Sequence, residues 1–194
     1  GAVVLNEFVR ESNMGTHGLE VAIQRFGNVG SYLAKFLHER GYSVVALSNV
    51  EGAIYDASGI DVPALFESYE DGDDLFAYGA ERITNAELLT LPVDILVPAA
   101  IEDQITSDNM EEIQADVVLE MANAPTTSRA DVYLNEQGVP VIPDILANAG
   151  GVTASYFEWV QNTTNEYWTE EQVRKKLADQ LQGAFNDLRE IKAE

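Results

Sequence analysis

The segment between Ile142 and Asn162 carries glycines and uncharged polar residues at spacings suited to ligand contact. Asn148 and the pair Gly150-Gly151 follow a strand-like run, and Ser155 comes a few residues later, at helical spacing. Paired glycines let a backbone approach a ligand closely, and the amide and hydroxyl groups could hydrogen-bond it. We expect a sharp loop with a flexible glycine hinge that opens a helix. The alternative is an ordinary helix start with Ser155 facing solvent.

A second segment, Val21 to Gly30, joins an apolar run to a glycine-containing turn. A dinucleotide-binding turn uses one glycine for the tight bend, a second for approach to the pyrophosphate and a third for helix–strand packing. Gly27 and Gly30 fit the second and third positions. A helix that begins near Asn28 would then aim its free N–H groups and positive dipole end at the phosphates.

Arg25 stands at the first position of this turn, where the pattern has glycine. One interpretation is that arginine is tolerated, with its guanidinium at the surface or reaching the cofactor phosphates. The other is that its side chain crowds the cofactor, or that the turn is strained by roughly 1–3 kcal/mol if its dihedral angles need a glycine. We favour tolerance.

Two further segments, Asp94 to Ala100 and Glu120 to Thr127, complete a set of four motifs in one order along residues 20–162. Together they closely resemble the C-terminal part of glutamate dehydrogenases, in the family that also contains leucine, phenylalanine and valine dehydrogenases. A single glycine motif would be weak evidence, whereas four in order are specific.

The resemblance implies a role for particular residues. Asn123 would lie near the nicotinamide ribose, Asn148 beside the nicotinamide, and the Ser155 hydroxyl would bond the side-chain carboxylate of glutamate. For Asn123 and Asn148 the alternative role is a loop-stabilising hydrogen bond. For Ala99 and Ala100, which the resemblance places beside the cofactor, the alternative is close packing after Pro98. The implied substrate residues are Val152 and Ser155, and the implied cofactor residues are Arg25, Phe26, Gly27, Asn28, Val29, Gly30, Asn49, Ala99, Ala100, Asn123 and Asn148.

Two more positions depart from the family pattern. Asn49 stands where an acidic residue normally bonds the adenine ribose and repels a 2′-phosphate. The cofactor is therefore NAD or NADP, with a slight preference for NAD if Glu51 reaches the ribose. Ala124 replaces a glycine between Asn123 and Pro125, a small change that we expect to be harmless.

Short apolar runs that alternate with helical segments predict an α/β fold, a doubly wound, mostly parallel sheet with helices on both faces (Rossmann-like). We expect residues 1–194 to form one dinucleotide-binding domain. The expected strands are 19–24, 43–47, 94–97, 117–119 and 139–142, with a possible extra strand at 53–55; the expected helices are 1–11, 28–40, 61–70, 107–113, 128–137 and 169–191. Ligands of such sheets bind at the carboxyl ends of the strands.

Charge and composition exclude several classes of function. The 194 residues include 33 Asp and Glu against 11 Lys and Arg, a net charge of −22, so nucleic acid and anionic membranes are poor partners. There is no cysteine, and no catalytic Ser/His/Asp or metal-ligand cluster is evident. The dispersed acids favour a cytoplasm with molar salt, where the Debye length is about 3 Å and like-charge repulsion is screened.

The resemblance also implies that catalysis needs groups this chain lacks. In the family, the lysines and the aspartate that activate the amino acid lie on a separate N-terminal domain. The chain alone should therefore bind dinucleotide without turnover, while the longer protein would interconvert L-glutamate and 2-oxoglutarate, as a homo-oligomer, in the cytoplasm. The alternative is a stand-alone, non-catalytic nucleotide-binding or regulatory module, which Arg25 and Asn49 favour.

Overall fold

A sheet of seven strands organises the chain in the computed structural model, which describes residues 1–12, 14–15, 17–72 and 74–193. The order across the sheet is β4-β3-β2-β1-β5-β6-β7. The five neighbouring strands β2, β1, β5, β6 and β7 run parallel to one another. Strand β3 pairs antiparallel with β2, and β4 pairs antiparallel with β3. The strands are β1 (Glu20–Gln24), β2 (Ser43–Ser48), β3 (Ala53–Tyr55), β4 (Glu81–Ile83), β5 (Ile95–Pro98), β6 (Val117–Leu119) and β7 (Val141–Ile142).

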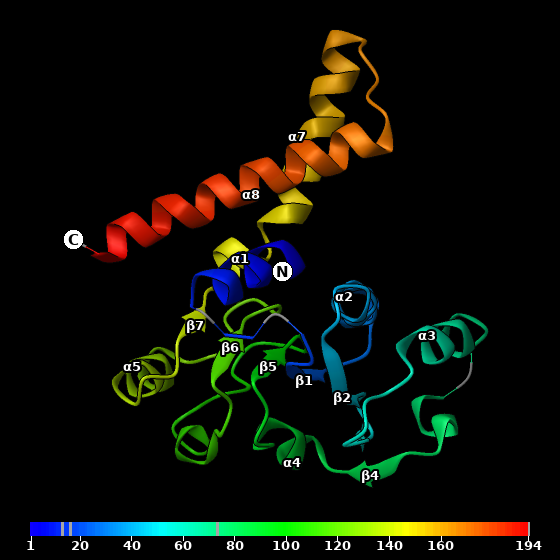
Figure 1. The fold of residues 1–194 in the computed structure, drawn as a ribbon, viewed down its shortest axis with the longest axis vertical. Helices are drawn as coiled ribbons and strands as arrows, with labels where there is room; N and C mark the ends of the chain where they lie inside the picture. Colours follow the sequence, from blue (N-terminus) through cyan, green and yellow to red (C-terminus); the bar gives the residue numbers. More distant parts are fainter. Residues whose placement is uncertain (13, 16, 73, 194) are drawn as a thin grey trace.

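Helices cover both faces of this sheet. Figure 1 shows α1 and α2 on one side of the strands, and α4 and α5 on the other. This is the doubly wound, mostly parallel α/β arrangement expected from the sequence. The helices are α1 (Ala2–Glu11), α2 (Asn28–His38), α3 (Val62–Glu70), α4 (Asn85–Leu89), α5 (Ser128–Glu136), α6 (Asp144–Ala147), α7 (Ala149–Thr164) and α8 (Glu170–Ala193), with 3-10 turns η1 (Leu75–Tyr78) and η2 (Met110–Glu112).

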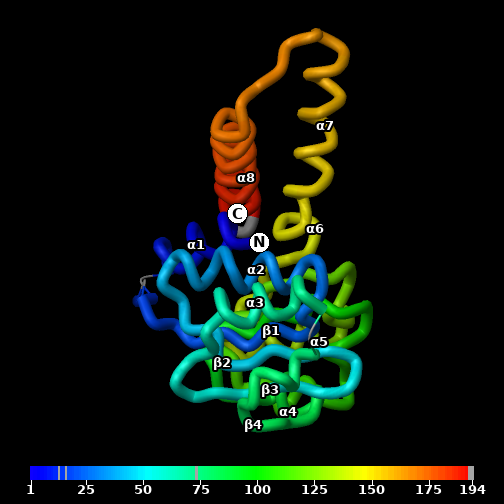
Figure 2. Tube along the Cα trace, turned by 90° about the vertical axis from the view of Figure 1, so that its right-hand side faces the viewer, coloured from blue at the N-terminus to red at the C-terminus, as the bar shows by residue number. Residues whose placement is uncertain are grey.

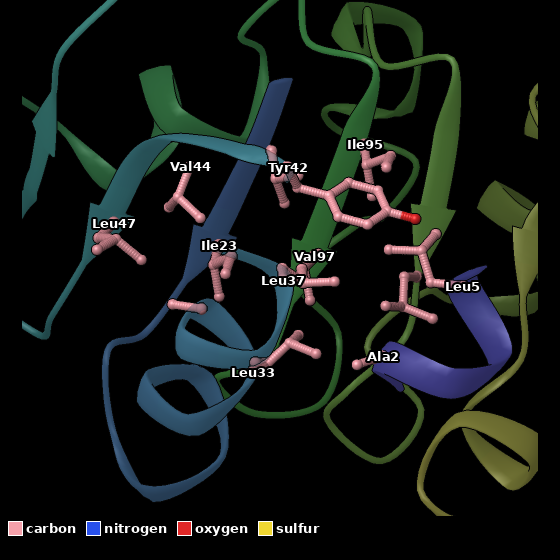
Figure 3. Close-up of a cluster of buried hydrophobic side chains, with 14 of the residues drawn as sticks. Ala2, Leu5, Ile23, Leu33, Leu37, Tyr42, Val44, Leu47, Ile95 and Val97 are labelled. Carbon is pink, nitrogen blue, oxygen red and sulfur yellow. The ribbon is translucent and has the colours of Figure 1, made fainter. Parts of the chain in front are cut away.

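The central strands have two apolar faces because both sides are covered. Successive side chains of a strand point to opposite faces, so Val21 and Ile23 of β1 pack into the cluster under α1 and α2, whereas Ala22 joins the cluster that contains residues of α4 and α5. Figure 3 shows the first cluster, in which Leu33 and Leu37 of α2 lie over the strands. All five side chains are at most 4% exposed.

The last two long helices leave the body of the sheet. In Figure 2, α7 rises away from the strands, and α8 returns beside it toward α1. The buried Leu181 and Phe185 belong to the core cluster of α1, and Arg189 forms an ion pair with Glu11, 2.5 Å between Nη1 and Oε1. Thr169 caps α8 as expected, since its Oγ1 accepts a hydrogen bond from the Gln172 N–H at 3.3 Å.

Three features of the structure differ from the sequence prediction. Residues 107–113 form no α-helix, only the short turn η2, because Thr106 and Asn109 direct their hydrogen bonds into a local loop. Strand β4 and helix α4 were not expected from the sequence; α4 begins at a capping box between Thr84 and Glu87. Expected strand 139–142 shrinks to β7, since Pro140 has no N–H to donate.

No helix in the described ranges is both long and apolar enough to span a membrane. Among the same residues, no group of three or more His, Cys, Asp or Glu side chains could hold a metal ion.

Candidate functional site

The turn after β1 brings the start of α2 into close contact with the backbone at the end of β1. A Cβ added to Gly30 would lie 2.1 Å from the Arg25 carbonyl oxygen, so only glycine fits here. Gly27 is the N-cap of α2 and supplies no side-chain cap, which leaves the first N–H groups of the helix available. Phe26 points the other way: it is 2% exposed and packs on Tyr69 with 5.0 Å between ring centroids.

Arg25 adopts a left-handed backbone conformation, with φ of +75°. An L-residue at such a φ costs about 1–2 kcal/mol relative to a right-handed one, so the position does have glycine-like dihedral angles. The side chain is exposed, and Nη1 donates a hydrogen bond to the Ala100 carbonyl at 3.1 Å. The backbone N–H donates to Ser48 Oγ at 3.0 Å, which ties the turn to the end of β2. Both sequence-based interpretations therefore hold in part: the guanidinium is accommodated at the surface and the backbone is strained.

Asn49 follows β2 and organises the turn into β3. Its Oδ1 accepts hydrogen bonds from the N–H groups of Glu51 at 2.8 Å and Gly52 at 3.2 Å. The Asn49 Nδ2 lies 3.5 Å from Asp74 Oδ1. Sequence reasoning alone did not single out Asp74, because its approach to Asn49 depends on a contact across 25 residues.

The loop after β6 is held in place by two carboxylates. The Ala124 N–H donates to Asp144 Oδ2 at 2.8 Å, and the Asp144 N–H donates to Glu120 Oε2 at 3.0 Å. Burial raises the pKa of the Glu120 carboxyl above its usual range, against the hydrogen bond from the Asp144 backbone that lowers it. Sequence reasoning alone did not single out these two carboxylates as positioning groups, because their partners are backbone N–H groups.

Ala124 has a φ of +43° in this loop. The expectation that alanine is a harmless replacement for glycine is therefore incomplete, because an L-residue is strained in this region. The Asp144 hydrogen bond and the contacts of the flanking carbonyls, Ala124 O with the Asp103 N–H at 3.1 Å and Pro125 O with the Gln104 N–H at 2.7 Å, maintain the conformation.

Asn148 and Asn123 lie together at the mouth of this loop. Asn148 Nδ2 is 3.3 Å from the Ala122 carbonyl oxygen and 3.4 Å from Asn123 Oδ1. The loop-stabilising hydrogen bonds considered from the sequence are thus present. The glycine hinge is not: α7 starts at Ala149, so Gly150 and Gly151 lie in its first turn, and neither has a positive φ.

A cavity of about 780 Å³ brings most of the expected residues together at the carboxyl ends of β1, β5 and β6. It is large enough for a substantial ligand, since small-molecule sites are usually about 300–1,000 Å³. Val152 and Ser155 lie outside it, exposed on α7. The expected residues in its wall are Arg25, Asn28, Val29, Ala99, Ala100, Asn123 and Asn148.

Other cavity residues were not singled out from the sequence. They include Ile101 and Glu102, which follow Ala100, and Met121 next to the Asn123 loop. Their position directly after a strand was the available signal, since ligands meet the chain there. A second cavity of about 230 Å³ lies beside the first and includes Asn49, Ser48 and Arg25.

Comparison with known proteins agrees with this geometry. Residues 1–194 match the family model described as Glutamate/Leucine/Phenylalanine/Valine dehydrogenase. The chain belongs to this family. It is 45% identical over 189 residues to the NAD-specific glutamate dehydrogenase of Staphylococcus aureus (strain COL), which covers 97% of this chain and 46% of that protein.

Glutamate dehydrogenase A2 of Halobacterium salinarum is 54% identical over 171 residues, 87% of this chain and 41% of that protein. Among solved structures, the hetero-hexameric glutamate dehydrogenase of Thermus thermophilus (Leu-bound form) superposes with a TM-score of 0.89 at 30% identity, over 95% of this chain and 44% of that one. The chain therefore spans less than half the length of the relatives it matches.

Proposed function

We propose that the chain is the cofactor-binding part of an NAD(P)-dependent glutamate dehydrogenase. The observation that carries the proposal is the cavity at the carboxyl ends of the parallel strands, where Arg25, Ala100, Asn123 and Asn148 arrive from four separate segments. The longer protein would convert L-glutamate, water and the oxidised dinucleotide to 2-oxoglutarate, ammonium, the reduced dinucleotide and a proton.

The residues of the turn fit a dinucleotide. Gly30 permits a contact that any Cβ would block, and the start of α2 offers uncapped N–H groups toward a phosphate. When bound, the nicotinamide would accept a hydride from the α-carbon of the substrate. The chain's own task is to bind and orient it: the contact between Asn148 and Asn123 holds two amides at the cavity wall, where they would hydrogen-bond the nicotinamide side.

The proposed cofactor is NAD rather than NADP. Asn49 does not itself repel a 2′-phosphate, but two carboxylates lie near it. The Asp74 Oδ1 is 3.5 Å from the Asn49 Nδ2, and Glu51 follows Asn49 by two residues in the exposed turn. These two negative charges would repel the 2′-phosphate on the adenine ribose of NADP. Asp74→Asn should therefore narrow the ratio of NADPH to NADH dissociation constants, and an unchanged ratio would remove Asp74 from the argument.

The proposed substrate is an amino acid with a second carboxylate. Ser155 is exposed on α7, four residues after Gly151, so it lies on the same face of the helix as this cavity-lining glycine. A hydroxyl there suits a carboxylate better than it suits an aliphatic side chain. In the longer enzyme, Ser155→Val should lower kcat/KM for glutamate relative to leucine. Equal effects on both substrates would count against this role.

The experiment that tests the proposal is calorimetric titration of the chain with NADH and with NADPH in molar KCl, followed by an assay for glutamate-dependent NADH formation. We expect binding, tighter for NADH, and no turnover by these 194 residues alone. A folded chain that binds neither nucleotide would contradict the cofactor role. NADH formation from glutamate by this chain would contradict its dependence on a second part.

The longer enzyme is also proposed to be a soluble oligomer in the cytoplasm. The Thermus thermophilus relative is described as hetero-hexameric. If the longer enzyme contains only one kind of chain, the corresponding assembly is a homo-oligomer. Light scattering of the longer protein in molar KCl would give its mass directly, and a monomer at micromolar concentration would contradict this assembly.

A further inference from the structure

Arg25 occupies the boundary between the two neighbouring cavities of the strand edge. It lines both of them, together with Ala100 and Ile101. The smaller cavity lies on the β2 side, at Ser48 and Asn49, and the larger one on the β6 side. A dinucleotide that lies along this edge would have its nucleoside halves in the two cavities and its pyrophosphate beside Arg25.

The guanidinium is the positive charge available at this boundary. Among the described residues that line either cavity, Arg25 is the one cationic side chain and Glu102 the one carboxylate. The whole chain has a net charge of −22. None of the ion pairs found among the described residues includes Arg25, whose Nη1 contacts a neutral carbonyl, that of Ala100.

The direction of the side chain also favours contact with an anion at the turn. A Cβ placed on Gly27 would lie 3.4 Å from Arg25 Nε, so the arginine stem runs directly over the N-cap of α2. The guanidinium thus lies in front of the turn that the glycines leave open. A guanidinium group can bind two phosphate oxygens at once with parallel hydrogen bonds, whereas a carbonyl group offers a single acceptor atom.

We propose that Arg25 binds the pyrophosphate of the dinucleotide, exchanging its hydrogen bond to the Ala100 carbonyl for hydrogen bonds to the phosphate oxygens. This inference deepens the proposed cofactor role and depends on it. It gives the strained φ of +75° a function, since glycine would relax the backbone but remove the charge. Arginine at this position therefore exchanges some stability of the turn for affinity.

The test compares four chains, unchanged, Arg25→Lys, Arg25→Gln and Arg25→Gly, by titration with NADH at a fixed molar KCl concentration. Loss of a charge-assisted phosphate contact should weaken NADH binding about tenfold or more in the Gln and Gly variants, and lysine should restore part of the affinity. Asn165→Gly is the matched control, because it places glycine at another positive φ, at the C-terminal end of α7 and outside both cavities, without changing the charge; its affinity should equal that of the unchanged chain.

Inorganic pyrophosphate is the second probe, followed through the Arg25 Nε–Hε signal in ¹H–¹⁵N spectra. We expect that signal to shift in the unchanged chain, and the pyrophosphate affinity to fall in Arg25→Gln. NADH binding that is equally tight in the Gln variant would overturn the inference alone. Pyrophosphate binding without NADH binding would support Arg25 and contradict the cofactor role, and a folded chain that binds neither would overturn both.

Discussion

Replacing Gly30 by alanine should destabilise the turn at the start of α2. The added Cβ would lie 2.1 Å from the Arg25 carbonyl oxygen and 3.4 Å from Ile23 Cγ2, whereas real Cβ contacts essentially never fall below 3.0 Å. The obstacle is backbone, so the helix start must move by the difference between 3.0 and 2.1 Å, about 0.9 Å. Overpacking of this kind costs about 1–3 kcal/mol.

Gly183→Ala in α8 is the matched control. A Cβ at Gly183 would meet no atom within 4 Å, so this variant gains only the helix propensity of alanine, about 1 kcal/mol. Because Gly30 also lies in a helix, α2, both variants share this propensity gain. Urea unfolding in molar KCl should therefore give a free energy of unfolding for Gly30→Ala that is lower than that of Gly183→Ala by the overpacking cost, about 1–3 kcal/mol. In thermal melts, each kcal/mol corresponds to about 2–4 °C for a chain of this size.

The same two variants separate stability from binding. NADH affinity should fall in Gly30→Ala, because the displaced turn no longer presents its N–H groups to the phosphates, and remain unchanged in Gly183→Ala. If Gly30→Ala proved as stable as Gly183→Ala and bound NADH normally, the close approach at this turn would have no role in fold or function.

Three further predictions follow from particular groups. Ala124→Gly should raise the free energy of unfolding by about 1 kcal/mol, because relief of the left-handed strain exceeds the added chain entropy; no gain in urea unfolding would show that a φ of +43° costs nothing here. Molar KCl should stabilise the chain relative to 0.1 M KCl, since the Debye length shrinks from about 10 to 3 Å; equal melting temperatures in both would contradict the halophilic interpretation. The pKa of Glu120 is raised by burial, so the folded state holds this proton more tightly than the unfolded state does. The free energy of unfolding should therefore fall as pH rises from the ordinary carboxyl pKa of 4.5 through the raised pKa of the folded state. Glu120→Gln should remove that fall, so its stability relative to the unchanged chain should increase across this window; a constant difference between pH 4 and 7 would refute the assignment.

The parallel part of the sheet was predictable from sequence because buried strands carry short apolar runs. Strand β6 (Val117–Leu119) has the expected bounds, β1 differs from its expected bounds by one residue at one end, and β5 differs by one residue at each end. Strand β4 has the sequence Glu81-Arg82-Ile83, two exposed charged residues and one half-buried apolar residue, so its pairing with β3 carries no apolar signal.

The site was predictable where function depends on a local pattern, and unpredictable where it depends on contacts between distant residues. The turn at Gly27 and Gly30 is a local pattern, and it lies at the strand edge as expected. The approach of Asp74 to Asn49 and the support of the Ala124 loop by Asp144 join residues 20 or more positions apart. No spacing rule connects them, and only the folded chain brings them together.

The glycine pair was misjudged for a different reason. Paired glycines suggest a hinge by their intrinsic freedom, but Gly150 and Gly151 lie within the first turn of α7, where helical hydrogen bonds fix them. Gly151 donates its N–H to the Asn148 carbonyl at 3.4 Å. Their small size still matters, because both line the larger cavity without filling it.

The central claim is that a dinucleotide binds along the carboxyl ends of the parallel strands. Its most direct test is a ¹H–¹⁵N correlation spectrum of the chain in molar KCl, recorded with increasing NADH. We expect the largest amide shifts at 25–30, 48–50, 99–102 and 121–123, around the two cavities that share Arg25. Shifts confined to the cavity between α7 and α8, at Tyr156 and Trp168, or none at millimolar NADH, would contradict it.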